Sequence, residues 1–463
     1  MTKRAIVLGA GCAGLSAAKR LREKGFEVVV VEADDHVGGL AGGVRFDGNV
    51  YEYGPHIFHT TDPELLAEVK ALMGPELLPY QRTIKIKFQD EYFDFPLKVR
   101  DVLRKLPPRT VLQAGATCLW RYLAGLWGRP AVENSEAMLV RYYGDVLYKI
   151  FFKDYISRVW GIPPAAFSPS FARERIPRLN FLDWVEKLSL ALLRPFRSPA
   201  RSRGQGYVEK VEGELYTTRE GFSLIARRMA ERLLDAGGTV RLNTRAAAIR
   251  RDGGRVRAVA VEGPAGSEEL PCDLLINTLP INEAVRMVEP GLGPEIAAAA
   301  SELRFRAIVF VGLQVAKPRV LPASFMYFRE HSFNRITDLS HFAVAVNPPG
   351  TTILIAEVAC DPNDRIWLDE AAAREAVLAD LERESLLDPK DIVTCHLFRA
   401  RHAHPMYTLG YEPALRKVLE AFTGLDCVET AGRQGSFQYV NAHIAMGMGY
   451  AAAERAAGRC RPA

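Results

Sequence analysis

The chain has 463 residues, of which 48% are hydrophobic and 25% are charged, and its formal net charge is +5. A chain of this length is too long for one compact core, so we expect two or three folding units in a globular protein of ordinary composition. The weak positive charge is compatible with an acidic ligand or a membrane surface, but it gives no reason to expect nucleic acid as a partner.

Seven cysteines are scattered along the sequence with no CxxC pair. This spacing fits neither a disulfide framework nor a zinc site, so we expect a reducing, cytoplasmic setting and no bound metal. The apolar run Ala5–Ala10 is short and leads directly into a glycine motif, which predicts a strand rather than a signal peptide. No apolar stretch reaches the roughly 18 residues that a membrane-spanning helix needs, which leaves only contact with a membrane surface open.

The beginning of the chain predicts one βαβ unit. Ala5–Leu8 is a short apolar run of the kind found in buried parallel strands. Leu15–Lys24 has apolar residues at helical spacing, and Gly25 ends the helix. A second strand is expected over Val28–Val31, followed directly by Glu32.

Gly9, Gly11 and Gly14 form the pattern G-x-G-x-x-G between the first strand and the helix. The first glycine permits a tight turn, the second lets the backbone approach a pyrophosphate, and the third lets the helix pack closely on the strand. The phosphates would then lie at the helix N-terminus, where free N–H groups and the helix dipole favour an anion. Glu32 would accept hydrogen bonds from a ribose, and a carboxylate there argues against NADP. The motif therefore predicts a dinucleotide site, with a purely structural turn as the alternative.

The next part of the chain changes its pattern twice. Residues 80–95 alternate apolar and charged side chains, which predicts an antiparallel hairpin with one face on a core. Residues 97–200 are rich in leucine, arginine and aromatic residues at helical spacing and predict a mostly helical insertion. The basic stretch 194–204 follows the leucines at 188–193 and predicts a loop that could attract an anionic lipid or a lipid-linked phosphate. Such a run is also common on a surface that is merely solvated.

An α/β pattern returns near residue 220. Phe222–Ala236 predicts an amphipathic helix that ends at a glycine pair. Short apolar runs predict strands over residues 240–242, 256–261, 273–277, 307–315 and 352–358, the last two in a second sheet. A final helix rich in alanine and methionine is expected from about His443.

Three motifs beyond the glycine turn are informative together. Glu32–Gly39 continues the dinucleotide motif as E-x5-G-G, Tyr53–Thr60 reads YGPHIFHT, and Ala431–Gly435 precedes the run Phe437–His443. These segments resemble the FAD-binding proteins of the amine oxidase, protoporphyrinogen oxidase and UDP-galactopyranose mutase superfamily. Asp35–Gly39 and Tyr53–Thr60 look most like the mutase branch, whereas the Gly-Glu-His/Thr element typical of true amine oxidases is missing.

The resemblance implies FAD as the cofactor. The residues that it places near FAD are Gly9, Gly11, Ala13, Gly14, Glu32, Ala33, Gly38, Gly39, Leu40, Gly432, Arg433, Asn441, His443 and Ile444. Gly432 and Arg433 would meet the pyrophosphate, and the helix that begins near His443 would point at the flavin O2 region.

The resemblance also implies an α/β fold with a discontinuous, Rossmann-like FAD-binding domain, made of residues 1–78, 215–285 and 415–463. An interleaved α+β substrate domain, a sheet plus a helical lobe, would comprise residues 79–214 and 286–414, with the helical insertion at 97–200.

His56 and His59 are the candidates for catalysis, because the resemblance brings them close to the flavin ring. From the residues alone, a packed and hydrogen-bonded pair of histidines is the alternative. No third ligand is visible beside them, so a metal site is not expected.

Three side chains are candidates for substrate binding. Arg335 lies in the polar stretch 332–338 and could deliver a guanidinium to a phosphate from a loop, or it could simply pair with Asp338 in solvent. Tyr407 and Tyr439 could stack on the flavin or the substrate, although aromatic residues more often pack in a core.

The flavin is expected to do the chemistry at its N5 atom, so few catalytic side chains are needed. The sequence predicts an FAD-dependent oxidoreductase or isomerase that acts on a sugar-nucleotide or glycosyl substrate, and we expect oxidised FAD to accept a hydride from it. A non-redox mutase that uses reduced flavin as a nucleophile is the alternative. A flavin-binding protein without activity would leave the large substrate domain unexplained. The substrate is expected to be small and anionic, and the protein cytoplasmic, with contact to a membrane surface left open.

Overall fold

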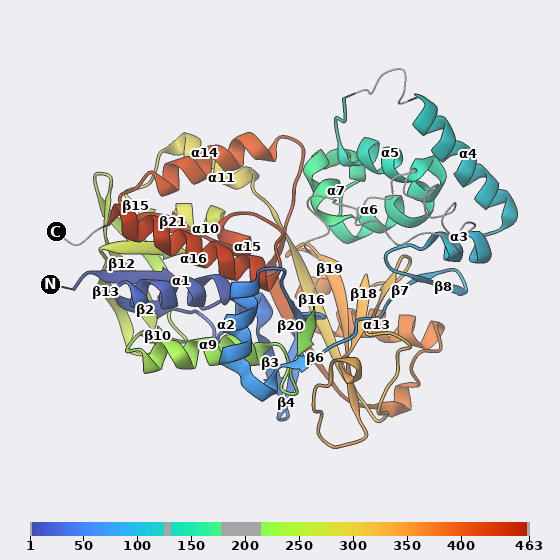
Figure 1. Cartoon of the computed structure of the whole chain (residues 1–463), viewed down its shortest axis with the longest axis horizontal. Helices are drawn as coiled ribbons and strands as arrows, with labels where there is room; N and C mark the ends of the chain where they lie inside the picture. Colours follow the sequence, from blue (N-terminus) through green and yellow to red (C-terminus); the bar gives the residue numbers. More distant parts are fainter. Residues whose placement is uncertain (1, 125–130, 177–213, 461–463) are drawn as a thin grey trace.

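The computed structural model describes residues 2–124, 131–176 and 214–460. Figure 1 shows three parts: an α/β unit that contains the beginning and the end of the chain, a second unit around a large sheet, and a helical lobe. The basic stretch at residues 194–204 and the leucines at 188–193 lie outside the described residues, as does the last part of the predicted helical insertion. No helix in the described ranges is both long enough and apolar enough to cross a membrane.

A parallel five-stranded sheet forms the centre of the α/β unit. In spatial order its strands are β10 (Thr239–Arg241), β2 (Glu27–Val31), β1 (Arg4–Leu8), β14 (Leu274–Asn277) and β21 (Val428–Thr430). All neighbouring strands are parallel. The predicted runs at 5–8, 28–31, 240–242 and 273–277 therefore become neighbours, although they come from distant parts of the chain.

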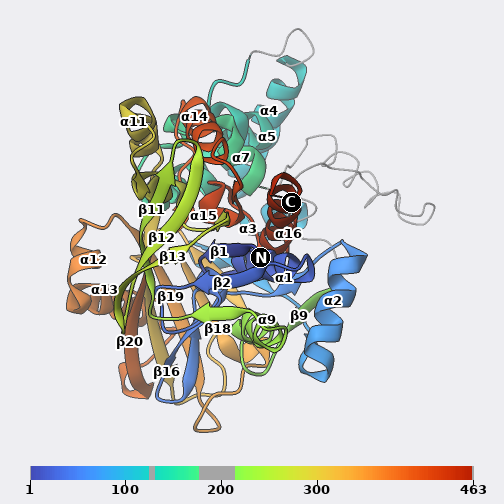
Figure 2. The same ribbon diagram turned by 90° about the vertical axis from the view of Figure 1, so that its left-hand side faces the viewer.

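The parallel sheet is covered on both faces, which explains its continuous apolar strands. Ala5 and Val7 pack with α1 (Cys12–Glu23), α9 (Ser223–Asp235) and α16 (Ala442–Arg459). Ile6 and Leu8 point to the opposite face, because side chains alternate along a strand, and pack with a second, four-stranded sheet. Figure 2 shows these layers edge-on, with the parallel sheet in the middle.

The four-stranded sheet has the order β13 (Gly266–Pro271), β12 (Arg255–Gly263), β11 (Arg245–Asp252) and β15 (Val288–Glu289). The predicted strand at 256–261 is confirmed as β12, which forms a hairpin with β11. The strands β11 and β13 were not predicted. Their mixed polar and apolar residues alternate only partly, because one face of the sheet is exposed. Helices α10 (Ile281–Arg286), α11 (Pro294–Glu302) and α14 (Tyr411–Thr423) pack beside this sheet.

The second unit contains a seven-stranded mixed sheet. In order, its strands are β20 (Ile392–Pro405), β16 (Phe305–Val315), β19 (Thr352–Cys360), β18 (Arg335–Asp338), β17 (Phe325–Phe328), β7 (Ile84–Phe88) and β8 (Glu91–Asp94). All pairs are antiparallel except β17 with β7. The predicted hairpin at 80–95 and the strands at 307–315 and 352–358 are confirmed. Helices α12 (Arg365–Leu368) and α13 (Glu370–Arg383) cover part of this sheet.

One expectation for this sheet was wrong. Arg335 was placed in a loop, but it begins the strand β18. The short strand is buried after its first residue and pairs with both β17 and β19. Such long-range pairing cannot be read from four residues of local sequence.

Two small sheets and one helix connect the units. One sheet pairs β3 (Gly43–Phe46) with β4 (Asn49–Glu52). The other has β9 (Leu215–Thr217) in the middle, with β5 (Phe58–His59) on one side and β6 (Leu78–Pro79) on the other. The helix is α2 (Pro63–Met73). The division of the chain into an FAD-binding and a substrate domain stays a prediction.

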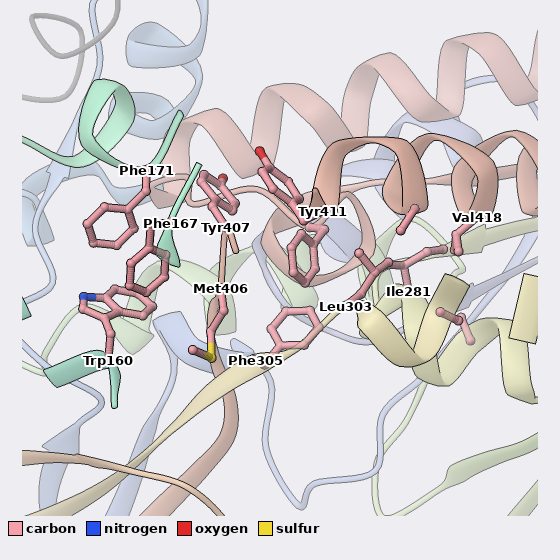
Figure 3. Packing of buried hydrophobic residues seen from close by; sticks show 14 of the residues in the cluster. Trp160, Phe167, Phe171, Ile281, Leu303, Phe305, Met406, Tyr407, Tyr411 and Val418 are labelled. Atoms are coloured by element: carbon pink, nitrogen blue, oxygen red, sulfur yellow. The ribbon is translucent and has the colours of Figure 1, made fainter. Parts of the chain in front are cut away.

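The described part of the predicted insertion is helical. It contains α3 (Val99–Lys105), α4 (Pro108–Ala124), α5 (Ser135–Tyr148), α6 (Asp154–Trp160) and α7 (Pro169–Arg175). Trp160 contacts Phe167 and Phe171 edge-on, at ring-centroid distances of 5.8 and 5.1 Å. Figure 3 shows these rings continuing through Met406, Tyr407 and Tyr411 into the apolar core beside α14. This shared core fixes the lobe against the α/β unit.

Glu52, at the end of β4, should make the stability of the fold depend on pH. Its side chain is buried, its carboxylate accepts a hydrogen bond from the backbone N–H of Phe222, and burial raises its pKa to about 8. Between the normal glutamate pKa and about 8, the folded state keeps a proton that the unfolded state has lost, so stability falls as pH rises. We expect a loss of roughly 2 kcal/mol in unfolding free energy between pH 5.5 and 7.5 from this residue.

Glu52→Gln keeps an acceptor for the Phe222 N–H but cannot ionise. Its unfolding free energy, measured by chemical denaturation at the two pH values, should lose that part of the pH dependence. An identical pH profile for both proteins would show that Glu52 is already ionised in the fold.

Candidate functional site

A cavity of about 670 Å³ lies where the three parts of the molecule meet. The glycine turn after β1 lines one end, and residues of β7, β17 and β18 line the other. The end of α7 brings the helical lobe to the same wall through Glu174 and Arg175. This volume lies within the range of small-molecule and cofactor sites.

The three glycines of the turn have different surroundings. Gly9 has φ +96°, and a Cβ on Gly14 would lie 1.9 Å from the carbonyl oxygen of Gly9, so the fold itself requires these two glycines. A Cβ on Gly11 would meet only the carbonyl oxygen of Gly38, at 3.8 Å. Gly11 lines the cavity at the N-terminus of α1, where no side chain caps the helix. This uncapped helix end beside open space fits the pyrophosphate of FAD.

Glu32 follows β2 and lines the cavity beside the turn. Its carboxylate accepts hydrogen bonds from the backbone N–H groups of Ala10, at 2.7 Å, and Asp34, at 3.1 Å. Burial raises its pKa. Glu32 thus holds the glycine turn in place, and the predicted contact with a ribose would add to that role.

His56 and His59 both line the cavity. Burial, together with the positive charges of Arg433 and Arg335, lowers the pKa of His56 to about 3, so its ring is neutral at pH 7. Its Nδ1 atom is buried without a hydrogen-bond partner in the described structure. His59, on β5, lies 4.5 Å from the ring centroid of His443. Their catalytic role stays a prediction, and no group of His, Cys, Asp and Glu within the described ranges could hold a metal ion.

Two half-buried arginines meet at Tyr439. The guanidinium of Arg175 lies 3.9 Å from the ring centroid of Tyr439, and that of Arg433 lies 4.8 Å from it. Arg175 donates to the carbonyl oxygen of Pro405, at 3.0 Å, and Arg433 donates to that of Val440. Burial lowers the pKa of Arg175 to about 10, and it also lowers the pKa of Arg433, but both stay charged at pH 7.

Neither Arg175 nor Arg433 forms an ion pair with any carboxylate of the described residues. Both side chains line the cavity. A charge that is partly removed from water and has no ion-pair partner is costly, so these two side chains favour an anion at this part of the wall.

Arg335 has different surroundings. It also lines the cavity, but its Nε and Nη2 atoms donate to the two oxygens of Glu357, at 2.6 and 2.7 Å. The Glu357 side chain is 1% exposed. The expected pairing with Asp338 is therefore wrong, because Asp338 turns inward and accepts backbone N–H groups of Val320 and Leu321. The charge of Arg335 is already neutralised before any ligand binds.

The other predicted residues divide into two groups. Those that line the cavity are Ala13, Gly38, Gly39, Leu40, Gly432, Asn441 and Tyr439. Those that do not line it are Gly14, Ala33, Tyr407, His443 and Ile444. For Tyr407 this corrects the expected contact with substrate: its ring is buried in the core, and its hydroxyl donates to Glu174 at 3.0 Å.

Several cationic and aromatic residues of the wall were not predicted from the sequence. They are Tyr53, Arg82, Phe95, Arg175, Arg245, Tyr327, Arg399 and Arg401. Arg175 follows Arg173 and Glu174 at the end of a short helix, a pattern that looks like a solvated helix end. Only the contact between α7 and the segment around Tyr439 reveals its burial.

Two family models match the chain. One, described as a flavin containing amine oxidoreductase, matches residues 180–456, and one described as an NAD(P)-binding Rossmann-like domain matches residues 7–72.

Two of the individual relatives are sugar-nucleotide mutases, and a 4,4'-diapolycopene oxygenase of Methylomonas sp is 25% identical over 438 residues, 83% of this chain and 82% of that protein. A probable UDP-galactopyranose mutase of Klebsiella pneumoniae is 28% identical over 187 residues, which are 39% of this chain and 47% of that protein. A dTDP-fucopyranose mutase of Escherichia coli is 26% identical over 185 residues, 38% of this chain and 47% of that protein. The chain thus matches about half the length of these two mutases. A crystal structure of reduced UDP-galactopyranose mutase superposes with a TM-score of 0.81 at 21% identity, over 99% of this chain and 96% of that one, which shows a common fold.

Proposed function

The chain belongs to the flavin-containing amine oxidoreductase family, and from this premise we propose that this FAD-dependent enzyme acts on a nucleoside diphosphate sugar. We assign residues 1–78, 215–285 and 415–463 to the FAD-binding domain. The glycine turn, Glu32 and the segment from Gly432 to Ile444 would hold FAD. Bound in its reduced state, FAD would supply a nucleophilic nitrogen for attack on the anomeric carbon of a sugar.

The two arginines without counter-ions, Arg175 and Arg433, are the observation that carries the proposal. A diphosphate would supply the missing negative charge and accept several charge-assisted hydrogen bonds from the two guanidiniums. The same wall would repel a cationic amine, and a hydrocarbon would leave both charges buried and unpaired. Of the carboxylates that line the cavity, Glu32 and Asp34 lie at the glycine turn. Glu174 accepts the Tyr407 hydroxyl and offsets part of the charge of Arg175 without forming an ion pair with it.

We propose a non-redox rearrangement of the sugar ring as the reaction. The likeness to two sugar-nucleotide mutases supports this choice. In such a reaction the protein mainly binds and orients the substrate, and it keeps water out of the cavity. His56 is neutral and buried, so it would position the cofactor or substrate by a hydrogen bond rather than donate a proton as a charged acid.

Oxidation of the same substrate is the second candidate. It is favoured by the family itself, whose description is that of an oxidoreductase.

An anaerobic experiment separates the two reactions. We expect UDP-galactose, added to the oxidised enzyme without oxygen, to leave the flavin absorption band unchanged. The dithionite-reduced enzyme should convert part of the sugar nucleotide between its pyranose and furanose forms, as chromatography of the products would show. Bleaching of the oxidised band by the substrate would instead support oxidation. A panel of other UDP- and dTDP-sugars extends the test, and absence of binding to every one of them would refute the proposed substrate class.

A further inference from the structure

The helix α4 presents a second apolar stripe to solvent. Six of its exposed positions follow helical spacing along one side: Arg109, Leu112, Gln113, Ala116, Leu119 and Trp120. Leu112 is 75% exposed, Trp120 68% and Leu119 45%. The opposite side, with Val111 and Ala114, already packs against the core of the lobe. A helix with one buried apolar side needs no second one for folding, so the outer stripe indicates a binding surface.

Positive charge surrounds this stripe. Residues 97–124 contain six basic side chains and one acidic side chain, Asp101, so this segment alone has the same net charge as the whole chain. Asp101 pairs with Lys105. Arg100, Arg104 and Arg109 are exposed, and none of them forms an ion pair with another described residue. Leu103, which is 43% exposed, extends the apolar surface onto α3. We call these residues, with Leu112, Leu119 and Trp120, the α3–α4 face.

Among the residues that the structure describes, none covers this face. In Figures 1 and 2, α4 lies at the outer edge of the helical lobe, on the side away from α1 and α9. An amphipathic helix in this position can lie flat against a bilayer while the cavity behind the lobe stays in water.

We propose that the α3–α4 face binds the surface of an anionic phospholipid membrane. Leu112, Leu119 and Trp120 would enter the interface between headgroups and acyl chains, where tryptophan is favoured. Arg100, Arg104 and Arg109 would contact the lipid phosphates around them. Large exposed apolar side chains next to unpaired arginines match this chemistry better than an acidic protein surface, which would satisfy the charges but not the apolar stripe. The proposal is independent of the reaction in the cavity.

Flotation with vesicles tests the proposal on the full-length, FAD-loaded protein. The protein should float with phosphatidylcholine vesicles that contain 30% phosphatidylglycerol and stay behind with phosphatidylcholine alone. Binding should weaken as salt is raised. Arg100→Gln, Arg104→Gln and Arg109→Gln together should weaken it roughly 100-fold, because each basic side chain near an anionic surface contributes about a fivefold factor. Leu112→Gln with Trp120→Gln should abolish it.

Leu234→Gln with Leu368→Gln is the matched control, because these two leucines are 51% and 70% exposed elsewhere on the surface. Flavin content and melting temperature show that each variant is folded. Equal flotation of the control and α3–α4 variants, or no flotation of the wild type, overturns the proposal. The proposal is also overturned if the protein does not bind vesicles but forms a dimer in analytical ultracentrifugation, and if the Leu112 and Trp120 changes dissociate that dimer. The difference in fluorescence between the wild type and Trp120→Phe reports on Trp120. If acrylamide quenches this fluorescence only weakly in the absence of vesicles, another part of the chain covers the face, and the proposal is overturned.

Discussion

Replacing Gly11 with valine should give a folded protein that no longer binds FAD. The backbone of Gly11 has φ −72°, which any residue can adopt, and a Cβ there would approach only the Gly38 carbonyl oxygen at 3.8 Å. The side chain would fill the space next to the helix N-terminus that we assign to the pyrophosphate. We expect FAD affinity to fall at least about 100-fold, or about 2.7 kcal/mol. The purified variant should be colourless, with near-normal circular dichroism, and titration with FAD should quench little flavin fluorescence.

Gly14→Ala is the matched variant for this experiment. It adds a smaller side chain, but its Cβ would collide with the backbone of Gly9 at 1.9 Å, so this variant should fail to fold. A yellow Gly11→Val protein with full FAD occupancy would show that the cofactor does not lie against this turn.

Replacing Arg175 with methionine should remove substrate binding without weakening the fold. The change deletes a half-buried charge that forms no ion pair with the described residues, so the free energy of unfolding should stay equal or rise by about 1 kcal/mol. The affinity for UDP-galactose should fall by about 3 kcal/mol, or roughly 100-fold, because a charge-assisted contact with the diphosphate is lost. Calorimetric titration measures the affinity, and chemical denaturation of the FAD-loaded protein measures the stability.

Arg335→Met provides the contrast, since Arg335 is paired with the buried Glu357. This variant leaves a carboxylate buried alone and should lose about 3–5 kcal/mol of stability. Adding Glu357→Leu should restore most of it. If Arg175→Met destabilises the protein as strongly as Arg335→Met and binds UDP-galactose normally, then Arg175 has a structural role and the proposed diphosphate site is wrong.

The elements that were predicted correctly are those whose signal is local. Ala5–Leu8, Val28–Val31 and Leu274–Asn277 are apolar throughout because the parallel sheet is covered on both faces, and the glycine turn follows directly from its sequence. The strand β20 was missed because it forms an edge of its sheet and carries arginines and histidines that hide its alternation.

The candidate site was predicted well only at its cofactor end. There, neighbouring residues in the sequence act together, as in the glycine turn with Glu32. The substrate end is assembled from the helical lobe, a short central strand and the segment around Tyr439. Whether an arginine there is free or paired depends on Glu357, 22 residues from Arg335 in the sequence, and on the packing of α7. No local pattern contains that information.

The arrangement of the parallel sheet has a consequence for the order in which the chain folds. The strand β1 lies between β2 and β14, and the sheet is completed by β21, so its last strand leaves the ribosome some 400 residues after its first. The first and last helices then meet closely: a Cβ on Gly449 would lie 2.1 Å from the carbonyl oxygen of Ala13. During most of synthesis, therefore, the apolar strand β1 and the glycine turn lack the strand and the helix that they contact in the folded protein. Contacts between residues so far apart in the sequence also form slowly. This interval is when the nascent chain is most exposed to aggregation and most dependent on chaperones.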